Sequence, residues 1–284
     1  MKKQQVILVA SGMLLLVVLY VFGETIPPRK NDVKPVAAAE QETPSFDIKN
    51  ELLSAKIKLS AARQGHLNSL ENSVVRGDVK NQQVHAYHQL ATFWKDSVPS
   101  LEPYAYYMAE ASKLENSEKS LTFAAQIFLD NLRGASDPGL KTWMASQAKD
   151  LFQRSLQLNP SNDSAKIGLG SAFIFGSPAE NPQELMKGIQ QILEVARKDS
   201  TNMYAQLMLG IGGVVSGQFD KAIERLLKVT SFQPGNLEAV LTLAEAYERT
   251  GDNKNALKWY NTSKNLIANP EVIKEIDIRI NSLK

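Results

Sequence analysis

The feature that most constrains the fold is an internal repeat, because residues 203–236 and 237–270 form two consecutive blocks of 34 residues with one shared pattern. In each block a Leu is followed by a small residue, then by a Gly and an Ala at matching positions. The small residue lets a second helix approach, the Gly permits a left-handed turn, and the Ala lies where two helices cross. The repeat therefore predicts two equivalent helical hairpins packed side by side. The aligned pairs are Leu209 with Leu243, Gly210 with Ala244, Gly217 with Gly251, and Ala222 with Ala256.

The period and the residue types resemble the tetratricopeptide repeat, whose L-G-x2-Y, A-x3-F and P signature has the same length. Tyr247, Ala256 and Tyr260 match that signature in the second block. In the first block Gly213 replaces the expected aromatic residue, and Pro234 matches the terminal Pro. The resemblance implies an all-α solenoid of helical hairpins that binds proteins, without selecting a particular partner.

The pattern continues towards the N-terminus with weaker matches. Residues 163–270 are predicted to hold the regular repeats, with Leu169, Gly170 and Phe173 at the L-G-x2-Y spacing of an earlier copy. Residues 84–162 are predicted to hold degenerate repeat-like helix pairs. Together these segments predict about five stacked pairs.

Helix starts are marked by an Asn or Asp followed by Pro, at residues 137–138, 181–182 and 269–270. The polar side chain can cap the first turn, and Pro is tolerated at the first helical position. After the last of these starts, residues 271–284 are predicted to form a capping helix. Such a helix is needed because the final repeat would otherwise leave its apolar face in water.

Residues 46–83 are predicted to be an amphipathic N-terminal segment, with one long helix from Phe46 to about Arg76. This segment is interpreted as a cap for the array rather than as a coiled coil, because the apolar residues do not keep a heptad. The apolar stripe consists of Ile48, Leu52, Leu59, Leu67, Leu70 and Val74.

The first 23 residues predict a signal anchor with one transmembrane helix. Residues 4–23 carry no formal charge, and at 1.5 Å per residue they span about 30 Å, the thickness of a hydrocarbon core. Lys2 and Lys3 favour a cytoplasmic N-terminus. The expected location is therefore the bacterial inner (cytoplasmic) membrane, as a single-pass protein with its C-terminal domain extracytoplasmic (periplasmic).

Two alternatives for this segment stay open. Val21 and Gly23 resemble the small residues before a signal-peptidase site, so a cleaved signal peptide is one of them. Arg29, Lys30 and Lys34 follow the apolar segment closely, so the reverse orientation is the other. The Pro-rich and Ala-rich residues 24–45 that follow are predicted to be a disordered linker, because they offer almost no large apolar side chains to bury.

Composition and motifs argue against several functions. The chain of 284 residues has a net charge of only +2 and contains no Cys, so we expect no nucleic-acid partner and no disulfide framework. Catalytic and nucleotide-binding signatures are absent from the sequence, so we expect no enzyme activity and no cofactor. His85, His88 and Glu110 have a spacing that would suit a metal, although ordinary surface or packing roles are commoner for such residues. Packing is also the expected role of most members of an aromatic cluster: Phe93, Trp94, Tyr104, Tyr106 and Tyr107.

In the tetratricopeptide family the first helix of each repeat lines a concave groove, which implies a peptide-binding surface in this chain. The groove implied is largely apolar with a polar, mainly acidic end, and whether the chain itself covers part of it stays open. The family's carboxylate clamp is not implied, because Ile167, Ser171, Met208, Glu238 and Thr242 occupy its positions. The implied groove residues are Ile167, Ser171, Ile174 and Phe175 from one repeat, Tyr204, Leu207, Ile211, Val214 and Val215 from the next, and Leu241, Glu245, Glu248 and Arg249 from the last regular one.

The sequence thus favours a membrane-tethered scaffold for protein–protein interactions, suited to envelope assembly, secretion or quality control. Its partner would be an unknown protein or peptide, and its membrane contact would be made through residues 4–23. The alternative is a structural homo-oligomer whose groove is filled by its own N-terminal helix.

Overall fold

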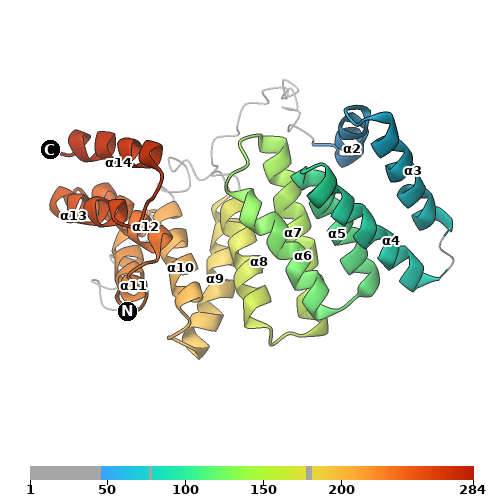
Figure 1. Cartoon of the computed structure of the whole chain (residues 1–284). Coiled ribbons are helices and arrows are strands. Elements are labelled where there is room, and N and C mark those ends of the chain that lie inside the picture. The colour runs from blue at the N-terminus through green and yellow to red at the C-terminus, as the bar shows by residue number, and fades with distance from the viewer. Residues whose placement is uncertain (1–45, 77–78, 177–180) are drawn as a thin grey trace, which may run out of the picture. The chain divides into compact units, whose positions relative to one another are not determined.

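The computed structural model describes residues 46–76, 79–176 and 181–284, which belong to one compact unit, Pro44–Lys284 (Figure 1). Within these residues all regular structure is helical, with thirteen α-helices, one short π-helical segment and no strand. The helices are α2 (Ile48–Ile57), α3 (Ala61–Arg76), α4 (Lys80–Thr92), η1 (Phe93–Ser97), α5 (Leu101–Glu115), α6 (Glu118–Leu132), α7 (Pro138–Leu158), α8 (Asp163–Gly176), α9 (Pro182–Lys198), α10 (Met203–Val215), α11 (Phe219–Phe232), α12 (Leu237–Arg249), α13 (Asn253–Lys264) and α14 (Pro270–Ser282).

Consecutive helices form hairpins that stack on one another, as the repeat predicts. The tightest packing lies within the pairs α4/α5, α6/α7, α8/α9, α10/α11 and α12/α13. The first helices of the last four pairs also contact each other in order, α6 with α8, α8 with α10, and α10 with α12. Figure 1 shows these successive helices packed side by side. The predicted all-α hairpin stack is confirmed for the described residues.

The two sequence repeats have equivalent turns and equivalent close contacts. Gly217 and Gly251 follow the first helix of their hairpins and have φ values of +74° and +77°, the left-handed conformation that glycine adopts without strain. Ala222 and Ala256 are fully buried at the helix crossings. The steric roles predicted for these four positions are confirmed.

The predicted capping residues begin their helices. Asp137 accepts a hydrogen bond from a first-turn backbone N–H of α7, and Asn181 and Asn269 do the same for α9 and α14, each with Pro directly after it. The repeats themselves begin at Asn202 and Asn236, whose side-chain oxygens each accept a backbone N–H at 3.0 Å. Local sequence therefore fixes where these helices start.

The N-terminal segment differs from prediction, because two helices replace the single long helix expected over residues 46–76. A turn between α2 and α3 separates them, and the side chain of Gln64 donates hydrogen bonds to the carbonyls of Lys56 and Leu59, at 3.2 and 3.0 Å. The Lys56 carbonyl also accepts the backbone N–H of Leu59 at 3.1 Å, so Gln64 adds to the hydrogen bonds that close the turn. The turn keeps Leu59 buried in the same core as the α3 residues.

The apolar stripe of this segment packs on α4 and α5 of its own chain. Leu59, Leu67 and Leu70 are buried in one cluster with Trp94 and Tyr107. Most of the aromatic cluster therefore has the packing role that was predicted, and the segment caps the array at its N-terminal end. In the homo-oligomer alternative, this stripe would have to leave its own core before it could fill the groove of another copy.

The C-terminal helix α14 covers the last repeat. Its Ile276 and Ile280 are buried against Ala244, Ala256 and Tyr260 of α12 and α13. The predicted capping helix is thus present. The predicted membrane anchor and linker, residues 1–23 and 24–45, lie outside the described residues. Where the structure is described, no helix combines the length and the apolar character needed to cross a bilayer.

Candidate functional site

Two adjoining cavities run along the first helices of the repeats. They have volumes of about 690 and 420 Å³, and Arg133 and Phe175 line both. We call the two together the groove. The larger cavity is lined by Arg133, Lys141, Ile174, Phe175, Ile211, Val214, Val215, Gly217, Phe219, Thr242, Glu245 and Arg249. The smaller is lined by Gln126, Leu129, Asp130, Arg133, Ser164, Phe175, Tyr204, Met208 and Glu238.

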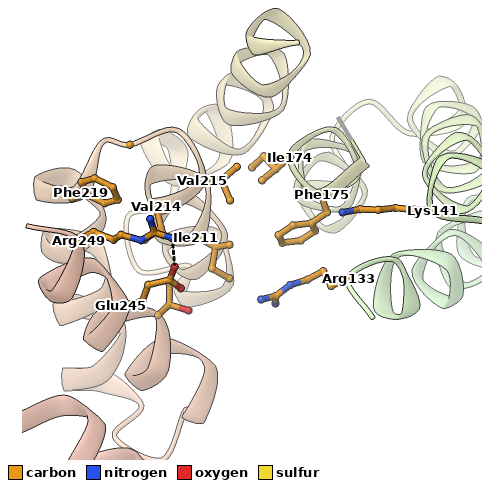
Figure 2. Close-up of a pocket in the computed structure, with 12 residues that line it drawn as sticks. Arg133, Lys141, Ile174, Phe175, Ile211, Val214, Val215, Phe219, Glu245 and Arg249 are labelled. Atoms are coloured by element: carbon orange, nitrogen blue, oxygen red, sulfur yellow. Dashed lines mark ion pairs between the residues drawn. The ribbon is translucent and has the colours of Figure 1, made fainter. Parts of the chain in front are cut away.

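The apolar wall of the larger cavity comes from the C-terminal ends of α8 and α10. Phe175 from α8 faces Ile211 and Val215 from α10 across the cavity, as Figure 2 shows. Val215 is 55% exposed, whereas Ile211 and Ile174 are almost fully buried and form the floor. The wall therefore offers solvent-accessible apolar surface on helices whose opposite faces are fixed in the core.

The structure brings most of the predicted groove residues together. On the larger cavity lie Ile174, Phe175, Ile211, Val214, Val215, Glu245 and Arg249. On the smaller cavity Phe175 is joined by Tyr204, which is 42% exposed.

Five predicted residues lie elsewhere. Ile167, Ser171 and Leu207 are buried between helices, because these positions of α8 and α10 turn towards the neighbouring repeat. Leu241 packs on the cluster that holds α14, and Glu248 accepts hydrogen bonds from Tyr260 and Arg279 in the same region. The position of Leu241 and Glu248 within the repeat predicted that both would line the groove. They lie instead on the face of α12 that meets α13 and α14.

The wall contributed by α6 was not predicted from the sequence. Gln126, Asp130 and Arg133 line the smaller cavity, and Arg133 with Lys141 of α7 also lines the larger one. The sequence did carry a signal for this wall. Because α6 is the first helix of its pair, the repeat pattern places it along the groove together with α8, α10 and α12. The weak repeat signature of residues 84–162 hid it.

The charges are unevenly distributed along the groove. The larger cavity has three basic side chains and one carboxylate, whereas the smaller cavity adds the carboxylates of Asp130 and Glu238. Arg249 pairs with Glu245 at 3.5 Å, and Arg133 pairs with Glu238 across the groove. Glu248 was predicted to line the groove but faces α14. Lys141 lines the larger cavity although it was not predicted to do so.

The position of Arg133 is fixed by several contacts. Its guanidinium lies 4.8 Å from the ring centroid of Phe175, a cation–π arrangement. Burial lowers the pKa of Arg133, while nearby Tyr204 opposes that shift. Burial likewise raises the pKa of Tyr204, whose hydroxyl bonds to Gln126. An arginine guanidinium keeps its charge in proteins, and that of Arg133 is partly removed from water at the junction of the two cavities.

The histidine pair does not assemble as the metal hypothesis required. His88 Nε2 lies 2.6 Å from a carboxylate oxygen of Glu115, whereas Glu110 accepts a hydrogen bond from Lys113 at 3.0 Å. His85 and His88 share a cavity of about 370 Å³ with His66. Among the described residues, no group of three or more His, Asp or Glu side chains is placed to hold a metal ion.

Comparison with models of known protein families gave no match, and comparison with curated protein sequences gave none either. Solved structures did match. TTC0263, a tetratricopeptide-repeat protein of Thermus thermophilus, is 15% identical, with 72% of this chain and 98% of that chain covered and a TM-score of 0.51. MamA of Desulfovibrio magneticus is 18% identical over 64% of this chain and 94% of its own, with a TM-score of 0.47. YrrB, described as a tetratricopeptide-repeat protein with an unusual peptide-binding site, is 16% identical over 68% and 90%, with a TM-score of 0.43.

The likeness to the Thermus protein concerns the fold, and it agrees with the repeat pattern, the equivalent left-handed glycines and the stacked hairpins. The chain therefore has the stacked-hairpin fold of tetratricopeptide-repeat proteins.

Proposed function

We propose that the chain is a protein-binding scaffold whose groove captures a peptide segment of a partner protein. The observation that carries the proposal is the solvent-accessible apolar wall formed by Phe175 and Val215, which faces a cavity of about 690 Å³. A peptide that covers this wall gains about 25 cal/mol for each Å² of apolar surface removed from water, before the cost of ordering it. Binding, rather than catalysis, is the role proposed.

The rigidity of the walls supports the proposal. Each wall residue is carried by a helix whose other face is buried, with Leu226, Val229 and Leu243 among the fully buried core side chains next to α10. A preformed site loses little conformational entropy when the ligand binds. The helices α6, α8, α10 and α12 therefore form a surface that need not reorganise to take a ligand.

Site-specific photo-crosslinking in intact cells tests the groove. A photoreactive amino acid at position 215 should capture a partner protein, whereas the same group at Ile278, which is 71% exposed on α14, should not capture it. Val215→Glu should abolish capture from a second photoreactive position on the wall, and Ile278→Glu should leave it intact. Equal capture from positions 215 and 278 would contradict the assignment of the groove.

The proposal includes a membrane tether through residues 4–23, with the repeats on the extracytoplasmic side. A tether raises the local concentration of the scaffold near partners in or at the same membrane, and so increases occupancy without any new contact. Such a placement would suit a role in envelope assembly, secretion or quality control. The full chain should resist carbonate extraction from membranes, and protease added to spheroplasts should digest the repeats. Extraction of the protein by carbonate would refute the membrane tether. Protection of the repeats from protease would refute their extracytoplasmic location.

A further inference from the structure

The larger cavity has an excess of positive charge. Of its three cations, Arg249 is paired with Glu245 of the same helix at 3.5 Å, and both side chains reach solvent. Lys141 from α7 makes no ion pair with any residue in the described part of the chain. Figure 2 shows Lys141 and Arg133 extending towards the cavity on either side of Phe175. The aromatic wall is therefore flanked by two cations.

Arg133 already holds a carboxylate in this groove. It forms an ion pair with Glu238, which lies 105 residues further along the chain at the start of α12. Glu238 lines only the smaller cavity, whereas Arg133 lines both. The pair thus lies at the junction of the two cavities and links the walls formed by α6 and α12. A carboxylate is therefore the partner of the guanidinium beside Phe175 within the chain itself.

We propose that the groove recognises a peptide segment in which an acidic side chain lies next to a bulky apolar one. This inference rests on the proposed function of the groove as a peptide-binding site. The apolar side chain packs on Phe175 and Val215, and the carboxylate binds Lys141 and Arg133. Glu238 acts as an internal competitor, because its carboxylate must give up Arg133 when the ligand binds.

Charge complementarity favours an acidic ligand over a basic one. Of the three carboxylates that line the groove, Glu245 and Glu238 pair with arginines of the chain itself, and Asp130 lines only the smaller cavity, where it accepts a hydrogen bond from Gln126. At the larger cavity, whose one carboxylate is Glu245, a basic ligand would have to break the pair with Arg249 and would also face Lys141. An acidic ligand meets Lys141 directly and replaces Glu238 at Arg133, and the released Glu238 side chain, which is 37% exposed, can be solvated by water.

Arrays of synthetic nonapeptides test the inference with the full chain purified in detergent. The peptides are acetylated and amidated, vary in their apolar residues, and carry Glu, Gln or Lys at one central position. Glu peptides should bind about five- to tenfold more tightly than their Gln counterparts, and Lys peptides should bind most weakly. The preference should fall as the salt concentration rises, since exposed charges are screened.

Two substitutions that remove charges of opposite sign test the inference further. Lys141→Gln should remove much of the preference for Glu peptides, whereas Glu238→Gln should strengthen their binding by freeing Arg133. Lys254→Gln, an equal charge change at an exposed site on α13, should change neither, and circular dichroism should show that all variants stay folded. If no peptide of any class binds, the proposed function fails. If peptides bind without regard to charge, or if Glu238→Gln does not strengthen binding of Glu peptides, only the present inference fails.

Discussion

At the scale of single residues, two glycines determine how closely α8 and α9 approach. A Cβ atom on Gly170 would lie 2.6 Å from the carbonyl oxygen of Gly188, and one on Gly188 would lie 2.5 Å from the carbonyl oxygen of Gly170. Backbone atoms cannot retract as a flexible side chain can, so the helices would have to move apart. The small residue of the L-G-x2-Y pattern is thus required by the close contact of two backbones.

We predict that Gly170→Ala destabilises the protein. Strain of about 1–3 kcal/mol from overpacking exceeds the gain of up to about 1 kcal/mol in helix propensity. Gly65→Ala is the matched control, because Gly65 is exposed on α3 and a Cβ there would meet no atom within 4 Å. That variant should be stabilised by about 1 kcal/mol. Urea unfolding measures both changes, and a stable Gly170→Ala protein would contradict the contact.

Glu248 makes the stability of the C-terminal end depend on pH. Burial alone would raise its pKa, but hydrogen bonds from Arg279 and Tyr260 outweigh it and lower the pKa below the ordinary value of 4.5. A lowered carboxylate pKa stabilises the fold above the unfolded value, and this stabilisation is lost as the pH falls through the folded pKa. The melting temperature should therefore exceed that of Glu248→Gln at pH 6–7. The difference should shrink below about pH 4.5, and a constant difference would exclude this linkage.

At the scale of helices, α14 covers the apolar face of the last repeat. Its buried and exposed faces allow a controlled test of this packing. Ile276 and Ile280 are 7% and 6% exposed, whereas Ile278 on the same helix is 71% exposed. We predict that Ile280→Ala lowers the free energy of unfolding by about 2 kcal/mol or more, because it removes buried methyl groups and leaves a cavity. Ile278→Ala should change it by less than about 0.5 kcal/mol. Similar losses in the two variants would show that α14 does not pack as described.

Helix starts could be predicted from sequence where an Asn or Asp precedes Pro, because capping is a local interaction between a side chain and the next turn. The break between α2 and α3 could not be predicted in this way. Its apolar residues are spaced as in a continuous helix, and the turn depends on Gln64 reaching back to the carbonyl groups of Lys56 and Leu59. The residue order does not distinguish that hydrogen bonding from an exposed Gln on an unbroken helix, and the one local signal is Ser60, whose hydroxyl oxygen accepts the backbone N–H of Arg63 at 3.5 Å.

At the scale of the whole molecule, the repeat pattern predicted only part of the groove. The repeat pattern predicted Phe175 and Val215 to line the groove, and both line the larger cavity near the ends of first helices. It placed Leu207 there as well, although that side chain is 5% exposed between repeats. It missed Arg133, because the repeat signature of residues 84–162 is weak, and the pairing of Arg133 with Glu238, 105 residues away, leaves no local pattern. The exposure of a side chain and its pairing with a distant residue depend on how successive hairpins are rotated against each other. The sequence of a single repeat does not determine that rotation.

Most packing in the described residues joins neighbouring helices, so stability should be distributed along the stack rather than shared uniformly. We predict that Leu243→Ala, which removes a fully buried side chain from α12, accelerates amide hydrogen exchange in α10 to α14 and leaves α3 to α5 unchanged. Leu227→Ala on α11, at a side chain 39% exposed, should have a much smaller effect. Exchange mass spectrometry of the full chain resolves these segments. Equal acceleration in every helix would instead mean that the stack unfolds as one cooperative unit, and the ion pair between α6 and α12 would then be a candidate for the coupling.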